Sequence, residues 1–177
     1  MTNEISFSFF FARHGQTEWN AQNRFVGRAD VPLNPTGTEQ AKQLAKSVSE
    51  LDIDLISTSP LLRAKETAKC VSDYTQIPVR VHHGLAEVDV GYLEGRTESA
   101  LNFVEEWRRD RLDASVERYQ EVSFRVRQAL RDIREQARLP LVVAHSRIFE
   151  VISGIANLTT EREIPNAKAV RISISGL

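Results

Sequence analysis

The chain has 177 residues, and 23 Lys and Arg against 24 Asp and Glu give it a formal net charge of −1. This balance excludes a general basic field that would attract nucleic acid or an anionic membrane, so we expect neither as a partner. The length predicts a single domain over residues 1–177. The sole cysteine, Cys70, excludes an intrachain disulfide. With no basic leader and no run of ~20 apolar residues, the sequence predicts a cytoplasmic protein.

Strand-like and helix-like apolar patterns alternate along the chain. In chain order, the predicted elements are a strand over 5–12, a helix from Thr36, a strand over 51–57, a helix from Ser59, a strand over 79–82, helices over 97–111 and 115–138, a strand over 139–144, a helix over 148–158 and a strand over 170–174. This alternation predicts an α/β fold, a three-layer α/β/α arrangement with a mostly parallel central sheet in a single domain.

Local signals place the predicted helix starts. Thr36 and Glu39 have the spacing of a capping box. Ser59 followed by Pro60 is typical of an N-cap with proline in the first turn. In the helix over 97–111, Leu101, Val104 and Trp107 are expected to share one apolar face.

Four side chains with phosphate-binding or nucleophilic chemistry follow the predicted strands. Arg13 and His14 come directly after the first strand, and His145 follows the strand over 139–144. The strand over 51–57 leads to Arg63 on the first turn of a helix. Because ligands of open parallel sheets bind beyond the carboxyl ends of the strands, we expect these four residues to meet at one edge of the sheet.

A longer series of motifs is far more specific than Arg13-His14-Gly15 alone. The series reads Arg13-His14-Gly15-Gln16-Thr17, Asn20, Arg24, Gly27, Asp30, Pro32-Leu33, Gly37, Gln40-Ala41, Ser59-Pro60-Leu61, Arg63-Ala64, Glu66-Thr67-Ala68, Glu87, Gly91, Glu94-Gly95, Thr97 and Ala144-His145. From Phe11 to about Asn166 it resembles the histidine phosphatase superfamily, also called phosphoglycerate-mutase-like proteins. The resemblance implies phosphoryl transfer through a phosphorylated histidine.

The resemblance gives the residues at the sheet edge chemical roles. Phosphoryl transfer depends mainly on positioning and on stabilising negative charge. The expected phosphate-binding residues are Arg13, Arg63, His145, Asn20 and Thr17. The arginines offer planar forks of donors, His145 a third donor, and Asn20 and Thr17 neutral donors.

His14 and Glu87 are the expected reacting groups. A neutral His14 is a competent nucleophile for phosphorus, and its second ring nitrogen needs an acceptor such as the Gly15 carbonyl. The resemblance makes Glu87 the general acid, and the charge of a bound phosphate favours its protonated form. Glu94, in the same loop, is the weaker candidate. No His, Cys or Asp spacing indicates a metal site, so we expect neither a metal nor another cofactor.

Two departures from the family pattern bear on substrate preference. After the second histidine the family usually has glycine and a short turn ending in arginine, whereas this chain has Ser146, Arg147 and, further on, Glu150. Before the long helix the usual Gly-Glu-Ser is replaced, and only Glu117 matches. Neither change touches the expected catalytic set of His14, Glu87, His145, Arg13 and Arg63.

Three functions fit the motifs. The segment over 97–115 is short, whereas similar mutases carry a longer insertion that excludes water from the phosphohistidine, so phosphate monoester hydrolysis is favoured over mutase transfer. A non-catalytic phosphate-recognition module would need neither His14 nor Glu87. A small phosphorylated metabolite is the expected substrate, with sugar phosphates, glycerate phosphates, nucleotides, a cobalamin-precursor phosphate and phosphoproteins all open.

Overall fold

A computed structural model describes residues 6–97, 102–158 and 164–177. Its strands are β1 (Ser6–Arg13), β2 (Ile56–Thr58), β3 (Val79–Val81), β4 (Leu141–Ala144) and β5 (Ala169–Ser175). Its α-helices are α1 (Glu18–Ala21), α2 (Pro35–Val48), α3 (Leu62–Thr75), α4 (Phe103–Arg108), α5 (Tyr119–Gln136) and α6 (Ser146–Ile155), with short 3₁₀ turns at His83–Leu85 and Gly91–Leu93.

The five strands form one sheet in the order β3-β2-β4-β1-β5. β1, β2, β3 and β4 pair in parallel, and only β5 runs antiparallel, along β1. Arg13 lies opposite Ala144 at the carboxyl ends of β1 and β4. The expected mostly parallel sheet is therefore confirmed, and the strands carrying His14 and His145 are direct neighbours.

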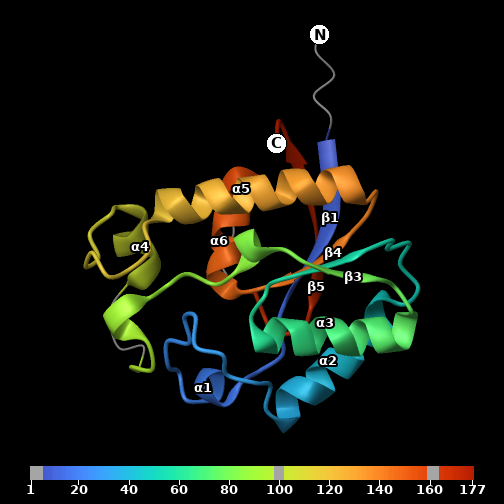
Figure 1. Ribbon diagram of the computed structural model, residues 1–177, viewed down its shortest axis with the longest axis horizontal. Helices are drawn as coiled ribbons and strands as arrows, with labels where there is room; N and C mark the ends of the chain where they lie inside the picture. Colours follow the sequence, from blue (N-terminus) through green and yellow to red (C-terminus); the bar gives the residue numbers. More distant parts are fainter. Residues whose placement is uncertain (1–5, 98–101, 159–163) are drawn as a thin grey trace.

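Helices cover both faces of the sheet, which confirms the three-layer α/β/α fold (Figure 1). Successive residues of β4 point to opposite faces: Leu141 and Val143 pack with apolar side chains of α2 and α3. Val142 and Ala144 pack with those of α5 and α6. All four residues are buried, so helices shield the centre of the sheet from solvent on both faces.

The start of α2 differs from the prediction. The helix begins at Pro35, and the N-cap is Asn34, whose Oδ1 accepts the backbone N–H of Gly37 at 2.8 Å. Thr36 therefore lies inside the first turn, and the predicted capping box with Glu39 is wrong. Asparagine at the N-cap followed by proline is itself a strong helix-start signal, and the helix begins there instead of at Thr36.

The predicted cap of α3 was also wrong. The helix begins at Leu62, and its first N–H groups are satisfied from two places: Ser59 Oγ accepts from Leu61, and Asp30 Oδ1, distant in sequence, accepts from Leu62 at 2.6 Å. Because Ser59 Oγ acts only as an acceptor here, its O–H remains available to donate a second hydrogen bond.

Other boundaries moved by a few residues. The strand predicted over 51–57 is paired only over β2. Among the described residues, the helices predicted over 97–111 and 115–138 cover only α4 and α5. Helix α6 begins at Ser146, directly after His145. Leu101, expected on the inner face of the first of these helices, lies outside the described residues, whereas Trp107 is buried.

Candidate active site

Two neighbouring parallel strands, β1 and β4, bring the two histidines together. β1 ends at Arg13 and is followed by His14, and β4 ends at Ala144 and is followed by His145. The His14 backbone N–H donates to the Ala144 carbonyl at 3.0 Å, so the pairing continues past the strand ends. As a result the centroids of the two imidazole rings lie 5.1 Å apart.

Hydrogen bonds determine the proton position on His14. Nδ1 lies 2.7 Å from the Gly15 carbonyl, which can only accept, so Nδ1 carries the proton. Nε2 lies 3.2 Å from Arg63 Nε–H, a group that can only donate, so Nε2 carries the lone pair. Burial, together with the charges of Arg63 and Arg13, lowers the pKa of His14 well below its usual value. The ring is therefore neutral near pH 7, with its unprotonated nitrogen toward Arg63.

Arg63 is held rigidly by backbone carbonyls. It is fully buried, and its Nη1 and Nη2 donate to Ala29 and Gly27 at 2.9 and 2.8 Å. Burial lowers its pKa to about 10, against the opposing charges of Glu87 and Asp30, so it remains cationic near pH 7.

Glu94 supports the loop that holds Arg63. One of its carboxylate oxygens accepts the backbone N–H groups of Arg28 and Ala29, each at 3.0 Å. Gly27 in the same loop has a φ of 51°, and a Cβ there would lie 2.6 Å from Val90 and 3.0 Å from Glu94. Glu94 therefore stabilises the loop that binds Arg63, and it does not line the recess beside His14.

His145 is oriented by Ser59. Its Nε2 lies 2.7 Å from Ser59 Oγ, while its Nδ1 is buried and has no hydrogen-bond partner among the described residues. Burial, followed by the charge of Arg63, lowers the pKa of His145 well below its usual value. The ring is therefore neutral and leaves one nitrogen for a ligand.

Glu87 is buried and held by backbone groups. Its two carboxylate oxygens accept the N–H of Val88 at 3.0 Å and that of Arg147 at 3.5 Å. Arg125 donates to the carbonyl oxygens of Gly84, Ala86 and Glu87, and it is paired with Glu117 at 2.8 Å. The Glu117 that matches the family pattern thus helps to hold the Glu87 loop in place.

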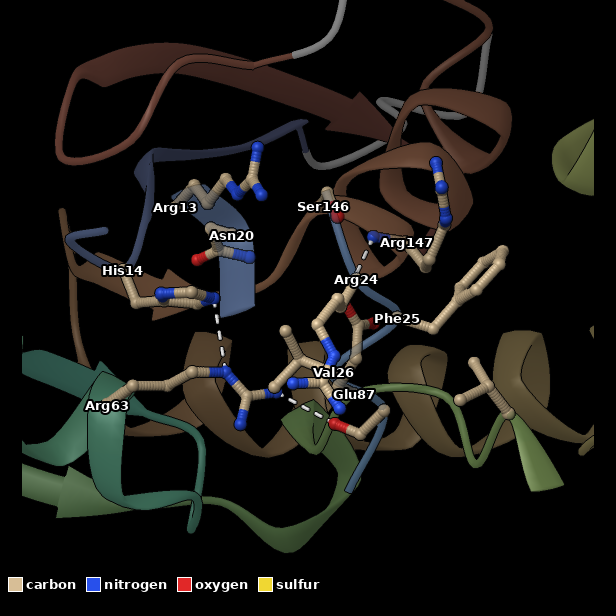
Figure 2. Close-up of a pocket in the computed structure, with 12 residues that line it drawn as sticks. Arg13, His14, Asn20, Arg24, Phe25, Val26, Arg63, Glu87, Ser146 and Arg147 are labelled. Atoms are coloured by element: carbon tan, nitrogen blue, oxygen red, sulfur yellow. Dashed lines mark hydrogen bonds between the residues drawn. The ribbon is translucent and has the colours of Figure 1, made fainter. Parts of the chain in front are cut away.

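His14, Arg63 and Glu87 line one recess at the carboxyl edge of the sheet (Figure 2). It is lined by Arg13, His14, Asn20, Arg24, Phe25, Val26, Gly27, Arg63, Glu87, Val90, Ser146 and Arg147. Five of the seven expected site residues therefore line a common space, and His145 lies beside it against the His14 ring.

Thr17 does not line the recess. It caps α1, where its hydroxyl accepts the Asn20 N–H at 3.2 Å and its own N–H donates to Asn20 Oδ1 at 3.1 Å. This capping box uses the Asn20 oxygen and leaves its amide N–H groups for a ligand. The expected direct contact between Thr17 and phosphate stays a prediction.

Sequence reasoning assigned no role to three residues at or beside the recess. Arg24 appears only in the motif series, Ser59 is predicted as a helix cap, and Arg147 appears among the departures that bear on substrate preference. Arg24 could have been found from the motif series, in which it is the arginine between Asn20 and Gly27. The Ser59–His145 bond, by contrast, joins residues 86 apart and has no local signal.

The departures after His145 fall in different places. Ser146 and Arg147 line the recess, and the Arg147 guanidinium lies 5.1 Å from the centroid of the Phe103 ring. Glu150 pairs instead with Arg108 at 3.1 Å, away from the reacting groups.

Within the described parts of the chain, no group of His, Cys, Asp and Glu has an arrangement that could hold a metal ion. Over the same residues, no helix combines the length and apolar character needed to cross a membrane.

Comparison with known proteins identifies the family. The family model described as histidine phosphatase superfamily (branch 1) matches residues 9–175. The chain belongs to the histidine phosphatase superfamily. It is 36% identical over 146 residues, 77% of this chain and 68% of the relative, to "Probable phosphoglycerate mutase GpmB" of Escherichia coli O1:K1 / APEC.

Solved structures agree with this assignment. A mycobacterial glucosyl-3-phosphoglycerate phosphatase is 25% identical with a TM-score of 0.80, over 96% of this chain and 91% of that one. A phosphoglycerate mutase from Bacillus anthracis str. Sterne, 23% identical with a TM-score of 0.83, shares the fold over 97% and 89%. Both phosphatases and mutases thus occur among similar proteins, and both transfer phosphoryl groups.

Proposed function

We propose that this protein hydrolyses phosphate monoesters through a phosphohistidine on His14, without a metal ion. One observation carries the proposal: the proton of His14 is held on Nδ1 by Gly15, and the lone pair of Nε2 lies at 3.2 Å from Arg63 in a recess that also contains Glu87. A neutral imidazole whose unprotonated nitrogen lies beside a phosphate-binding arginine is arranged for attack on phosphorus.

In the first step, the phosphoryl oxygens bind Arg13, Arg63, the Asn20 amide and His145 Nδ1. The lone pair of His14 Nε2 forms the N–P bond while the bond from phosphorus to the ester oxygen breaks. Glu87 gives its proton to the leaving alkoxide. The arginine charges stabilise the negative charge of the transition state in place of a metal ion.

In the second step, the Glu87 carboxylate accepts a proton from water as the water oxygen attacks phosphorus. The N–P bond breaks, inorganic phosphate leaves, and His14 regains the lone pair on Nε2. Glu87 returns to its protonated form, so one residue serves as acid and then as base.

The phosphoenzyme is the direct test. After rapid quenching of turnover, an acid-labile phosphoryl label is expected on the peptide that contains His14, and hydrolysis should persist in EDTA. His14→Ala should lose both label and hydrolysis, whereas His83→Ala, at an exposed histidine, should keep them. Hydrolysis by His14→Ala near the wild-type rate, or loss in EDTA with rescue by magnesium or zinc, would refute the mechanism.

Mutase transfer is the second candidate, supported by the name of the 36%-identical relative. The short segment over 97–115 favours hydrolysis, because water must be excluded for a phosphohistidine to survive. Phosphate release from 3-phosphoglycerate should exceed its conversion to 2-phosphoglycerate. Efficient isomerisation primed by 2,3-bisphosphoglycerate would reverse the ranking, and label on His14 without any turnover would indicate a non-catalytic phosphate-binding module.

A further inference from the structure

The recess carries more positive charge than the proposed chemistry uses. Its lining includes the arginines Arg13, Arg24, Arg63 and Arg147, against one lining carboxylate, Glu87. The proposed mechanism uses Arg13 and Arg63, and Arg147 packs its guanidinium over the Phe103 ring. Arg24 has no task in phosphoryl transfer.

Arg24 is nevertheless held in a defined orientation. Its Nε donates to the Gly95 carbonyl, its Nη1 to Gln22 Oε1 at 3.3 Å, and its guanidinium carbon lies 4.5 Å from the centroid of the Trp19 ring. Gly95 has a φ of 75°, and a Cβ there would lie 3.2 Å from Arg24 Nη2 and 3.4 Å from the Trp19 ring. The backbone and an aromatic face therefore confine this side chain to the edge of the recess.

No carboxylate neutralises Arg24 among the described residues, where its hydrogen-bond partners are a carbonyl and an amide oxygen. The arginine charges that lower the pKa of His14 are those of Arg63 and Arg13. Arg24 is not one of these charges, but it lines the same recess (Figure 2). An arginine that is held in place, lines a ligand space and has no carboxylate partner among the described residues is suited to bind an anion.

We propose that Arg24 forms a second anion subsite, and that the substrates are phosphate monoesters whose alcohol part carries another negatively charged group. This rests on the proposed function for the identity of the first subsite. The shared chemistry of the second group is an oxyanion, either a carboxylate or a second phosphate. It accepts hydrogen bonds from Arg24 while the transferred phosphoryl group is held by Arg13 and Arg63.

Paired substrates test the subsite. 3-Phosphoglycerate and glycerol 3-phosphate differ in a carboxylate against a hydroxymethyl group, and fructose 1,6-bisphosphate and fructose 6-phosphate differ in a second phosphate. A hydrogen bond to a charged group corresponds to about 10- to 100-fold in affinity. Arg24→Gln should lower kcat/KM by that order for the doubly anionic member of a pair, mainly through KM, and leave the other member within about twofold.

Two further variants separate a subsite from a general effect of charge or folding. Arg96→Gln removes an exposed arginine that also lies over an aromatic ring, 5.3 Å from the centroid of Tyr92, but does not line the recess. It should change neither substrate pair. Arg24→Lys, which keeps the charge but not the planar fork, should recover part of the lost preference.

The results distinguish the subsite from the phosphatase proposal. Equal losses for both members of each pair, or no loss, would overturn the subsite even if hydrolysis continues. If the wild type hydrolyses nothing, calorimetric binding of the same four ligands to wild type and Arg24→Gln still decides on Arg24, while the absence of hydrolysis counts against the proposed function alone. The pair that shows the larger loss identifies the second group as carboxylate or phosphate.

Discussion

At the scale of single residues, Ser59 decides how His145 can act. For Nδ1 of His145 to donate to a phosphoryl oxygen, the neutral ring must accept a hydrogen bond at Nε2, so the Ser59 hydroxyl must be the donor at 2.7 Å. The same oxygen accepts the Leu61 N–H at 3.2 Å, which leaves its proton for His145. Ser59 is thus a positioning residue that acts through the tautomer of His145.

Ser59→Ala should therefore lower the rate constant of phosphoenzyme formation by about tenfold, because a hydrogen bond to a buried ring is worth about 1–2 kcal/mol. The pH profile of this rate constant should shift as well. The matched control is Ser57→Ala, since the buried Ser57 hydroxyl has no hydrogen-bond partner among the described residues. Equal effects of the two substitutions on rate and pH profile would contradict a role in setting the tautomer.

Glu87 is tested through the leaving group. Glu87→Gln keeps the shape but removes the proton, and general acid catalysis is typically worth ~10²–10⁴-fold. In single-turnover formation of phosphoenzyme, an alkyl phosphate should lose about that factor, whereas p-nitrophenyl phosphate, with its stabilised phenolate, should lose clearly less.

Glu94→Gln is the matched control for this experiment. Its amide oxygen can still accept the N–H groups of Arg28 and Ala29, so any loss should be the same for both substrates. If Glu87→Gln also slowed both substrates equally, Glu87 would not be the acid, and a dependence on the leaving group in Glu94→Gln would point to Glu94.

At the scale of elements, the first turn of α2 supports the loop that carries His14. A Cβ on Gly37 would lie 2.0 Å from the Gln16 carbonyl oxygen, and one on Gly15 would lie 2.3 Å from the Gly37 carbonyl oxygen. Both neighbours are backbone and cannot move aside without moving the loop. These two glycines therefore permit the close approach of α2 to the loop that follows His14.

Gly37→Ala should displace this loop and slow phosphoenzyme formation by at least about tenfold, because small misplacements of reacting groups are costly in rate. Thr36→Ala, at the exposed neighbour in the same turn, should leave the rate nearly unchanged. A Gly37→Ala protein with the wild-type rate of label incorporation at His14 would show that the close approach is not needed.

At the scale of the whole molecule, the buried histidines couple folding to pH. Burial lowers the pKa of His14 and of His145 below the usual 6.5. Below that pH the two histidines bind protons in the unfolded chain but remain neutral in the folded chain. The free energy of unfolding should therefore rise with pH up to about 6.5 and level off above it, with a slope of up to ~1.4 kcal/mol per pH unit for each histidine.

Urea denaturation at pH 7.5 and 5.5 measures this coupling. Wild type should lose stability at the lower pH, and His14→Ala should lose less because one of the two groups is gone. The exposed His83 provides the control, since His83→Ala should lose as much as wild type. A protein equally stable at both pH values would show that the two rings take up protons as readily in the folded chain as in the unfolded chain.

The alternation of strands and helices, the three-layer fold and the sheet edge shared by Arg13, His14 and His145 all follow from patterns in the amino-acid sequence. Apolar periodicity reports which face of a segment is buried, and residues directly after parallel strands must meet at one edge. Gly15 as the acceptor for His14 was also predicted, because the two are neighbours in the chain.

The hydrogen bonds that hold the side chains come from segments that are distant in sequence. Arg63 is clamped by carbonyls 34 and 36 residues away, Ser59 binds a ring 86 residues away, and Asp30 closes the end of α3 from another loop. A local pattern carries no information on such partners. The hydrogen bonds that orient His145 and confine Arg24 depend on which distant segments the packing of the sheet and its helices brings into reach.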